Sequence, residues 1–273
     1  MLDPHQIRQF YLRGFQETAK LYEWPGIWRK QFKIRTREGH FMKLNKLRNR
    51  LNFRSLLGFC VRYTPLNLYM SALNWLMPER VGRKSRANGA YPVGGEYVID
   101  IDNPSLMRSW GGVNGFSLSG LQLTHDKTLT LLDKIRENYS EIRIVFSGRR
   151  GFHIHILDFN VRDWTEYTEK DPVKSHEVAR FLYTRYLQTA LGEISKYHFI
   201  LSTDPMRVMT VPGSLNGRTG KICFLVGDPH DFERLTLDEV ITKSDSRKYL
   251  YNNGFQAASS LVHAHPEPSR GGR

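Results

Sequence analysis

The spacing of apolar residues divides the chain into helices and short strands. Helical periodicity is predicted over four segments, residues 2–22, 63–77, 124–138 and 175–196. Thr124 and Ser175 are the expected N-caps of the last two helices. Short apolar runs typical of strands occupy residues 96–102, 142–147, 152–157 and 221–226. Helices mixed with these strands predict an α+β (mixed α/β) fold with substantial helical decoration.

The length and composition favour a globular protein without a membrane span. The chain has 273 residues, 40% of them hydrophobic, which suffices for a sizeable core. We expect one domain over residues 1–258 and a disordered tail over residues 259–273, where periodic apolar content is lacking. No run is long and apolar enough for a membrane helix, and the first residues do not resemble a signal peptide. A cytoplasmic, nucleoid-associated location is therefore expected.

Cysteine usage excludes two common kinds of site. The two cysteines, Cys60 and Cys223, are far apart in sequence. They cannot form a disulfide framework or a zinc site made of thiols alone.

The charge of the chain favours an acidic polymer as partner. Forty Lys and Arg residues against 27 Asp and Glu give a net charge of +13. Residues 29–54 hold ten basic residues and one acid, with aromatic residues interleaved. That mixture suits single-stranded nucleic acid, because cations contact phosphates and rings stack on bases. A solvated basic face with its rings turned into the core fits the same pattern.

A pair of acids ends one predicted strand. Asp100 and Asp102 are two residues apart, so their side chains leave the same face of a sheet about 6–7 Å apart. Unpaired carboxylates are costly to bury, and a divalent cation would compensate them. A solvated strand end is the simpler alternative.

Two further blocks combine turn residues with cations. In the block 147–155, glycines flank Arg149 and Arg150 between two strands, and His153 and His155 share a face of the second strand. Backbone and guanidinium groups in such a turn can converge on phosphate oxygens. The block 204–221 adds a carboxylate, cations and a turn-rich loop. Each block alone is also compatible with an ordinary basic hairpin.

The order of these blocks resembles a known family. Asp-x-Asp, then Ser-Gly-x-Arg-Gly-x-His, then Pro-Gly-Ser-Leu-x-Gly-x-Thr-Gly is similar to the motif series of the archaeo-eukaryotic primase superfamily, DNA primase small (catalytic) subunit. The segment from Pro65 through Tyr69 and Ser71 also resembles that family, and the similarity extends from about residue 37 to 227. It implies a primase-polymerase core with a central, mostly antiparallel sheet. It also implies an enzyme that joins nucleotides into RNA or DNA primers on single-stranded DNA.

The resemblance assigns roles by position. It makes Asp100 and Asp102 catalytic ligands of a two-metal site holding Mg²⁺ or Mn²⁺, with His153 as a further catalytic residue. The nucleoside triphosphate would be bound by Ser147, Gly148, Arg149, Arg150, Gly151, His153, Arg207 and Asn216. Asn216 stands where the family usually has a histidine. Single-stranded DNA template and a separate iron-sulfur large subunit are the implied macromolecular partners.

The chain departs from the family at the third metal ligand. The family's third acid lies fourteen residues before the proline that matches Pro212, and His198 occupies that position here. Asp204 matches a second acid common in archaeal members. His198 and Asp204 are therefore equal candidates for the missing metal ligand. The cysteine-rich zinc module of many archaeal members is also absent, so a smaller plasmid, viral or lineage-specific primase fits as well as a cellular one.

Two other functions remain open from the sequence. His198 in place of an acid is compatible with a catalytically inactive, primase-like subunit that binds nucleic acid. The His153-x-His155 pair also has the form found in rolling-circle DNA nickases, for which Tyr183 or Tyr186 would be the nucleophile. The nickase hypothesis leaves Asp100, Asp102 and the block after Pro212 without a role.

Overall fold

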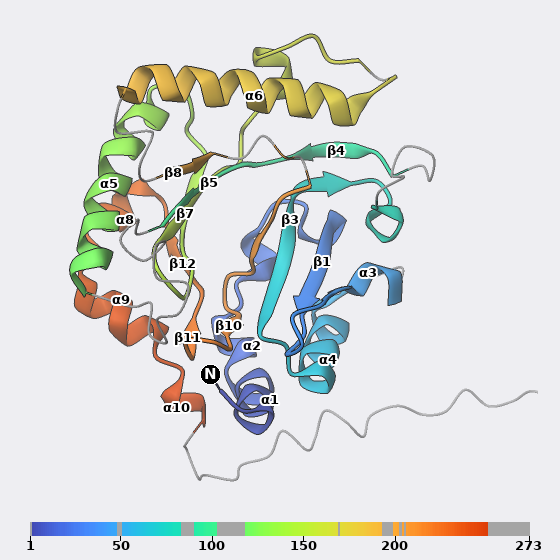
Figure 1. Ribbon diagram of the computed structural model, residues 1–273, viewed down its shortest axis with the longest axis vertical. Helices are drawn as coiled ribbons and strands as arrows, with labels where there is room; N and C mark the ends of the chain where they lie inside the picture. The colour runs from blue at the N-terminus through green and yellow to red at the C-terminus, as the bar shows by residue number, and fades with distance from the viewer. Residues whose placement is uncertain are drawn as a thin grey trace, which may run out of the picture.

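Antiparallel strands form the centre of the protein in the computed structural model (Figure 1). It describes residues 2–47, 51–82, 90–102, 118–168, 170–192, 199–201, 204 and 206–250. Within these residues every strand pair is antiparallel. Helices pack around the strands, so the predicted α+β fold with a mostly antiparallel centre is confirmed.

The strands of the described residues make two large sheets and one short ribbon. Sheet A has the order β2 (Phe41–Lys43), β1 (Lys30–Arg35), β3 (Asn67–Trp75), β4 (Pro92–Gly95), with β9 (Val208–Thr210) also paired to β3. Sheet B has the order β12 (Phe224–Gly227), β6 (Ile142–Phe146), β7 (Phe152–Ile156), β5 (Tyr97–Ile101), β8 (Phe199–Leu201). The ribbon pairs β10 (Leu215–Asn216) with β11 (Lys221–Ile222).

The helices cover the outer sides of these sheets (Figure 1). Sheet B is covered by α5 (Leu118–Arg136) and α6 (Pro172–Leu191). The N-terminal helices α1 (Pro4–Arg13), α2 (Phe15–Thr18), α3 (Leu44–Leu47) and α4 (Phe53–Tyr63) share a core with sheet A. The C-terminal part adds α8 (Pro229–Glu233), α9 (Leu237–Ser244) and α10 (Arg247–Leu250). Short 3-10 helices are η1 (Leu21–Glu23), η2 (Ile27–Arg29), η3 (Pro78–Arg80) and η6 (Val161–Asp163).

The helix predicted over residues 63–77 is wrong. Helix α4 ends at Tyr63, and Thr64 follows with a left-handed φ of 40°. Residues 67–75 then form strand β3, which pairs with β1 on one side and with β4 and β9 on the other. A strand in the middle of a sheet is buried along most of its length, so its apolar residues do not alternate cleanly. Such a run cannot be distinguished from a buried helix by periodicity alone.

Three predicted helix boundaries also differ from the structure. The N-terminal helix is interrupted at Gly14, which separates α1 from α2. Helices α5 and α6 begin before Thr124 and Ser175, whose hydroxyls donate to the carbonyls of Gly120 and Asp171 four residues earlier. Such back-bonding is typical of Ser and Thr inside a helix rather than at its cap.

Two further expectations were a C-terminal tail and the absence of a membrane span. The predicted tail, residues 259–273, lies outside the described residues. Among the residues that are described, no helix is both long enough and apolar enough to cross a membrane.

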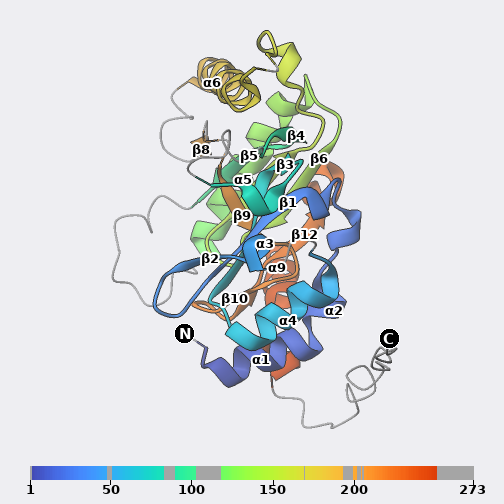
Figure 2. The ribbon, with the colours of Figure 1, turned by 90° about the vertical axis from the view of Figure 1, so that its right-hand side faces the viewer.

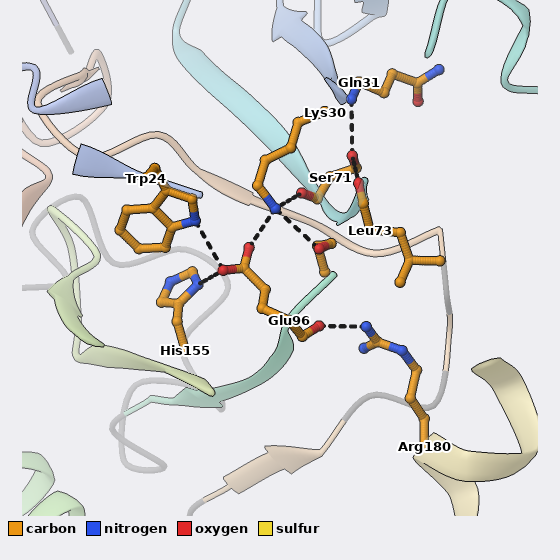
Figure 3. Close-up of polar contacts among 9 residues, drawn as sticks. Trp24, Lys30, Gln31, Ser71, Leu73, Glu96, His155 and Arg180 are labelled. Carbon is orange, nitrogen blue, oxygen red and sulfur yellow. Dashed lines mark hydrogen bonds and ion pairs between the residues drawn. The ribbon is translucent and has the colours of Figure 1, made fainter. Parts of the chain in front are cut away.

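A buried ion pair joins the two sheets (Figure 3). Glu96 is the single residue between β4 of sheet A and β5 of sheet B, and 2% of its side chain is exposed. Lys30 of β1 donates from Nζ to Glu96 Oε1 at 2.9 Å and to the carbonyls of Ser71 and Ala72 in β3. The contacts of Lys30 and Glu96 thus fix the point where the chain crosses between sheets.

Other buried groups complete the surroundings of Glu96. The indole of Trp24 donates to Oε2 at 2.9 Å, and His155 Nδ1 of β7 lies 3.3 Å from the same oxygen. The guanidinium of Arg180 on α6 donates to the main-chain carbonyl of Glu96 (Figure 3). Strands of both sheets and one covering helix therefore meet at one residue.

Burial acts on both members of the ion pair. Burial alone would raise the pKa of Glu96, but Lys30 and His155 outweigh it and lower that pKa to about 2. Burial lowers the pKa of Lys30 in spite of the opposing effect of Glu96. We take the pair as charged at neutral pH because the ammonium has three oxygen acceptors. The stabilisation from Glu96 is complete above its unfolded pKa of about 4.3 and is lost as the pH falls towards 2.

Removing the lysine should destabilise the fold strongly. Lys30→Met leaves a buried carboxylate without its cation, and we expect the free energy of unfolding to fall by about 3–5 kcal/mol. Urea unfolding at pH 7 measures the change. Lys134→Met, which breaks the exposed pair between Lys134 and Glu137, should leave the unfolding midpoint nearly unchanged. A Lys30→Met protein as stable as the parent would show that the ion pair does not hold the sheets together.

Candidate active site

Strand alternation places the two acids opposite the helical core. In β5, Ile99 and Ile101 are buried in the core shared with α5 and α6, so Asp100 leaves the other face of sheet B. In the antiparallel register, Asp100 is paired with His153 of β7. His153 Nε2 lies 3.5 Å from Asp100 Oδ1. The aspartate and the histidine that were predicted from separate motifs are therefore side by side.

The turn between β6 and β7 brings the arginines to the end of β5. A Cβ atom at Gly151 would lie 1.8 Å from the carbonyl oxygen of Ile101, so only glycine permits this approach. Gly148 has a φ of 75°, which also favours glycine. Arg150, between these glycines, donates to Asp102. The glycines are therefore required by the geometry of the predicted phosphate-binding turn.

A polar cleft collects residues from both sheets. It has a volume of about 140 Å³ and is open to solvent. The lining residues are Arg35, Asn67, Tyr69, Asp100, Asp102, Ser147, Arg149, Arg150, His153, Thr210, Asn216 and Arg218.

Each acid in the cleft has an arginine partner. Arg207 Nη2 donates to Asp100 Oδ2 at 2.7 Å, and Arg150 pairs with Asp102. Burial raises the pKa of both acids, and the neighbouring charge of Asp100 raises that of Asp102 further. The arginines oppose this increase. The two carboxylates thus need positive charge nearby in order to remain ionised together.

The chemistry of these donors fits divalent cations only in part. Asp100 and Asp102 are hard oxygen ligands on one face of one strand, as Mg²⁺ and Mn²⁺ prefer. Among the described residues, however, no group of three His, Cys, Asp or Glu side chains is arranged to hold a metal ion. A third protein ligand of the metal would have to come from a residue other than Asp100 and Asp102.

The structure describes one of the two candidates for that ligand. Asp204 is exposed, its Oδ1 accepts a hydrogen bond from the backbone N–H of Met206, and it does not line the cleft. His198 lies outside the described residues.

Excess cations and a neutral histidine make the cleft suited to an anion. Burial and the neighbouring charges of Arg150 and Arg218 lower the pKa of Arg149, so these guanidinium groups repel one another. Burial, followed by the effect of His155, lowers the pKa of His153 to about 3, so its ring is neutral at neutral pH. His153 Nδ1 has no hydrogen-bond partner in the described part of the chain. A bound phosphate would reduce the repulsion among the guanidinium groups, and a hydrogen-bond donor or acceptor on the ligand could pair with His153 Nδ1.

The remaining predicted nucleotide ligands are close to this cleft. Ser147 lines it, and the Ser147 hydroxyl is 3.4 Å from the backbone nitrogens of Arg149 and Gly151. Asn216 also lines it, but its Oδ1 accepts hydrogen bonds from the backbone N–H groups of Arg218 and Thr219. The structure thus gives Asn216 a role in shaping the loop, and its contact with a nucleotide stays a prediction.

Several lining residues were not predicted from the sequence. Arg35, Asn67 and Thr210 come from strands of sheet A, and Arg218 follows the ribbon strand β10. The sequence signal for these residues was the alternation in β1, where buried Phe32 and Ile34 flank the more exposed Lys33. This alternation predicts that β1 has a polar face, but it does not predict that the polar face lies opposite the acids of sheet B.

The burial of Tyr183 and His155 does not favour the nickase hypothesis, whereas Tyr186, the other candidate nucleophile, is 37% exposed. Tyr183 is fully buried among aromatic rings of the helical core, and burial raises the pKa of its hydroxyl. His155 is also fully buried, beside Glu96. A tyrosine nucleophile and its histidine pair would need access to DNA.

Comparison with known proteins finds similarity to DNA primase small subunits. A family model described as DNA primase small subunit matches residues 128–228. The DNA primase small subunit PriS of Pyrobaculum calidifontis is 25% identical over 247 residues, which cover 79% of this chain and 76% of the relative. That of Pyrobaculum islandicum is 22% identical and covers 92% and 89%.

The chain is similar in sequence to DNA primase small subunits. An uncharacterized DNA primase small subunit-like protein of Archaeoglobus fulgidus is 32% identical over 141 residues, 48% of this chain and 44% of the relative. Among solved structures, the polymerase domain of Mycobacterium tuberculosis ligase D in complex with DNA aligns with a TM-score of 0.46 and 12% identity. The alignment covers 87% of this chain and 85% of that one. The primase resemblance inferred from the motifs is confirmed.

The arginine turn should bind a polyphosphate without any other ligand. Arg149→Gln removes a charged donor from the cleft, and we expect inorganic tripolyphosphate to bind about 10-fold more weakly or worse. Isothermal titration calorimetry measures the affinity. Arg185→Gln, on the exposed side of α6, is the matched control and should bind as the parent does. Equal affinities for all three proteins would exclude Arg149 as a phosphate ligand.

Proposed function

We propose that the protein is a nucleotidyltransferase, a DNA primase of the small-subunit type. It would make short RNA or DNA primers on a single-stranded DNA template by two-metal nucleotidyl transfer. One observation carries this proposal. Two acids, a neutral histidine and an arginine-rich turn, which are separate in sequence, line one cleft. The relationship to DNA primase small subunits supports the same function.

The acids are the proposed metal ligands. Asp100 and Asp102 would hold Mg²⁺ or Mn²⁺, and the bound ions would activate the primer hydroxyl and stabilise the leaving pyrophosphate. Arg207 and Arg150 now supply positive charge to these carboxylates. Metal ions bound at Asp100 and Asp102 would take over the charge compensation that the two arginines now provide and would free the guanidinium groups for phosphate.

The cations and the histidine are the proposed triphosphate ligands. Arg149 and Arg218 are not paired with either acid and can donate to phosphate oxygens. His153, neutral and buried, would donate from its ring to an oxygen next to Asp100. These groups orient the nucleotide, so that its reacting phosphate would lie beside the acids.

Two macromolecular partners belong to the proposal. The first is the single-stranded DNA template, supported by the net charge of +13. The second is a primase large subunit, which rests on the family resemblance alone.

Removal of one carboxylate charge tests the catalytic proposal. Asp102→Asn keeps the shape of the side chain but removes a charge that the metal ions need. Template-dependent incorporation of labelled nucleotide in Mn²⁺ should therefore fall by several orders of magnitude, while single-stranded DNA is bound as before. The matched control is Asp133→Asn on the exposed side of α5, with the activity of the parent expected. Near-normal incorporation by Asp102→Asn would refute the metal assignment.

A catalytically inactive, primase-like subunit is the second candidate function. The pairing of Asp100 and Asp102 with arginines and the histidine at position 198 favour it. It predicts that the parent chain binds single-stranded DNA but incorporates no nucleotide, with or without Mn²⁺.

Changing position 198 tests which residue completes the metal site. We expect His198→Asp to raise Mg²⁺-dependent incorporation about 10-fold or more, because carboxylate suits Mg²⁺ better than imidazole does. Asp204→Ala should have little effect, since Asp204 does not line the cleft. The opposite result, loss of activity in Asp204→Ala and no gain in His198→Asp, would assign the third ligand to Asp204.

A further inference from the structure

An exposed aromatic ring stands next to the cleft. Phe41 lies on β2, the edge strand of sheet A, and 57% of its surface is exposed. Its ring centroid is 5.7 Å from that of Tyr69, and the guanidinium of Arg35 is 5.9 Å from the ring centroid. Tyr69 and Arg35 both line the cleft, whereas Phe41 does not. Phe41 therefore lies just outside the cleft, in contact with two of its walls.

The strand register puts this ring on the same face as the cleft. Residues paired directly in an antiparallel ladder project to one face of the sheet. Arg35 is paired with Phe41 on one side and with Asn67 on the other. Asn67 and Arg35 line the cleft, so the face that forms the cleft wall continues outward to Phe41.

Two lysines extend this face. Lys33 of β1 is paired with Lys43 of β2 and, on its other side, with Tyr69 of β3. Like charges directly opposite each other destabilise a sheet. Burial, followed by the charge of Lys43, lowers the pKa of Lys33, while Asp204 opposes this effect. Burial and Lys46 lower the pKa of Lys43, whose Nζ also donates to the carbonyl of Val81 at 3.1 Å.

A phosphodiester chain matches these features. An anion between the lysines would relieve the repulsion between them, and an exposed ring offers a flat face to a base. Figure 2 shows the turn of the β1–β2 hairpin at the edge of the molecule.

We propose that the face formed by Lys33, Phe41 and Lys43 is a binding subsite for single-stranded nucleic acid, in which one base stacks on Phe41 and the lysines contact the adjoining phosphates. The strand is assigned as the template, and this assignment rests on the proposed function. The candidate triphosphate ligands are on the β6–β7 turn and on the loop after β10, whereas Phe41 is on the edge strand β2 and does not line the cleft. The base on Phe41 therefore belongs to the strand that leads into the cleft and not to the incoming nucleotide.

Fluorescent oligonucleotides test the stacking directly. Single-stranded DNA that carries 2-aminopurine is titrated with protein, without nucleotide or metal, and both affinity and quenching are recorded. Phe41→Ala should weaken binding about 5-fold or more and abolish the quenching at one position of the oligonucleotide. Phe41→Leu keeps an apolar side chain without a ring and should lose the same quenching. Phe41→Trp should retain it.

Matched changes separate stacking from other effects. Phe181→Ala removes a similarly exposed phenylalanine from α6, 53% exposed, and should change neither affinity nor quenching. An abasic site at the quenched position should weaken binding to the parent but not to Phe41→Ala, because both changes remove the same contact. Lys33→Gln and Lys43→Gln should each reduce the slope of log affinity against log salt by about 0.7 while the quenching persists.

The result that overturns the proposal is clear. If Phe41→Ala and Phe41→Leu bind and quench as the parent does, no base stacks on this ring. If a separate titration with nucleoside triphosphate, without DNA, shows weaker binding by both variants while DNA binding is unchanged, the ring belongs to the nucleotide site instead. Binding is measured without catalysis, so these outcomes are independent of whether Asp102→Asn removes incorporation.

Discussion

The buried ion pair between Lys30 and Glu96 is the constraint on which the site depends. Glu96 is the one residue between a strand of sheet A and a strand of sheet B, and Lys30 binds it from a third strand while donating to carbonyls of β3. Desolvating two charges is costly, and it is offset here only because both have several polar partners. The geometry of these contacts sets how the two sheets meet, and the cleft lies along that junction.

The strands that leave this junction carry the site on their polar faces. Asp100 lies two residues after Val98, on the same face of β5. Val98 packs against Ala72 and Met209 of sheet A. Beyond this apolar contact the sheets present acids, histidine and arginines to each other instead. The charged cleft thus lies next to an apolar contact between the sheets, and its excess of cations over acids is the reason that we expect it to bind phosphates. The same face of sheet A continues to Phe41 and the lysine pair.

Local features of the site were predictable from the sequence, and long-range ones were not. Two short strands joined by a turn with flanking glycines identify the β6–β7 hairpin, and its register follows from the turn. Asp100 and Asp102 share a face because strand side chains have a period of two. Strand β3 was mistaken for a helix because it is buried by neighbours distant in sequence. The ion pair joins positions 66 residues apart, and periodicity contains no information about such a pairing. For the same reason the contribution of Arg35 and Arg218 to the cleft could not be predicted. The role of His198 as a third metal ligand stays a prediction.

The central claim is that Asp100 and Asp102 form one metal and nucleotide site with the arginine turn. The most direct measurement is a crystal structure with Mn²⁺ and a non-hydrolysable nucleoside triphosphate, in which anomalous scattering locates the metal. We expect manganese at about 2.0–2.2 Å from carboxylate oxygens of both acids, near the ideal octahedral distance for a small divalent ion. We also expect phosphate oxygens within hydrogen-bond distance of Arg149 and His153. Manganese bound elsewhere, with Asp100 still paired to Arg207 and Asp102 to Arg150, would contradict this claim.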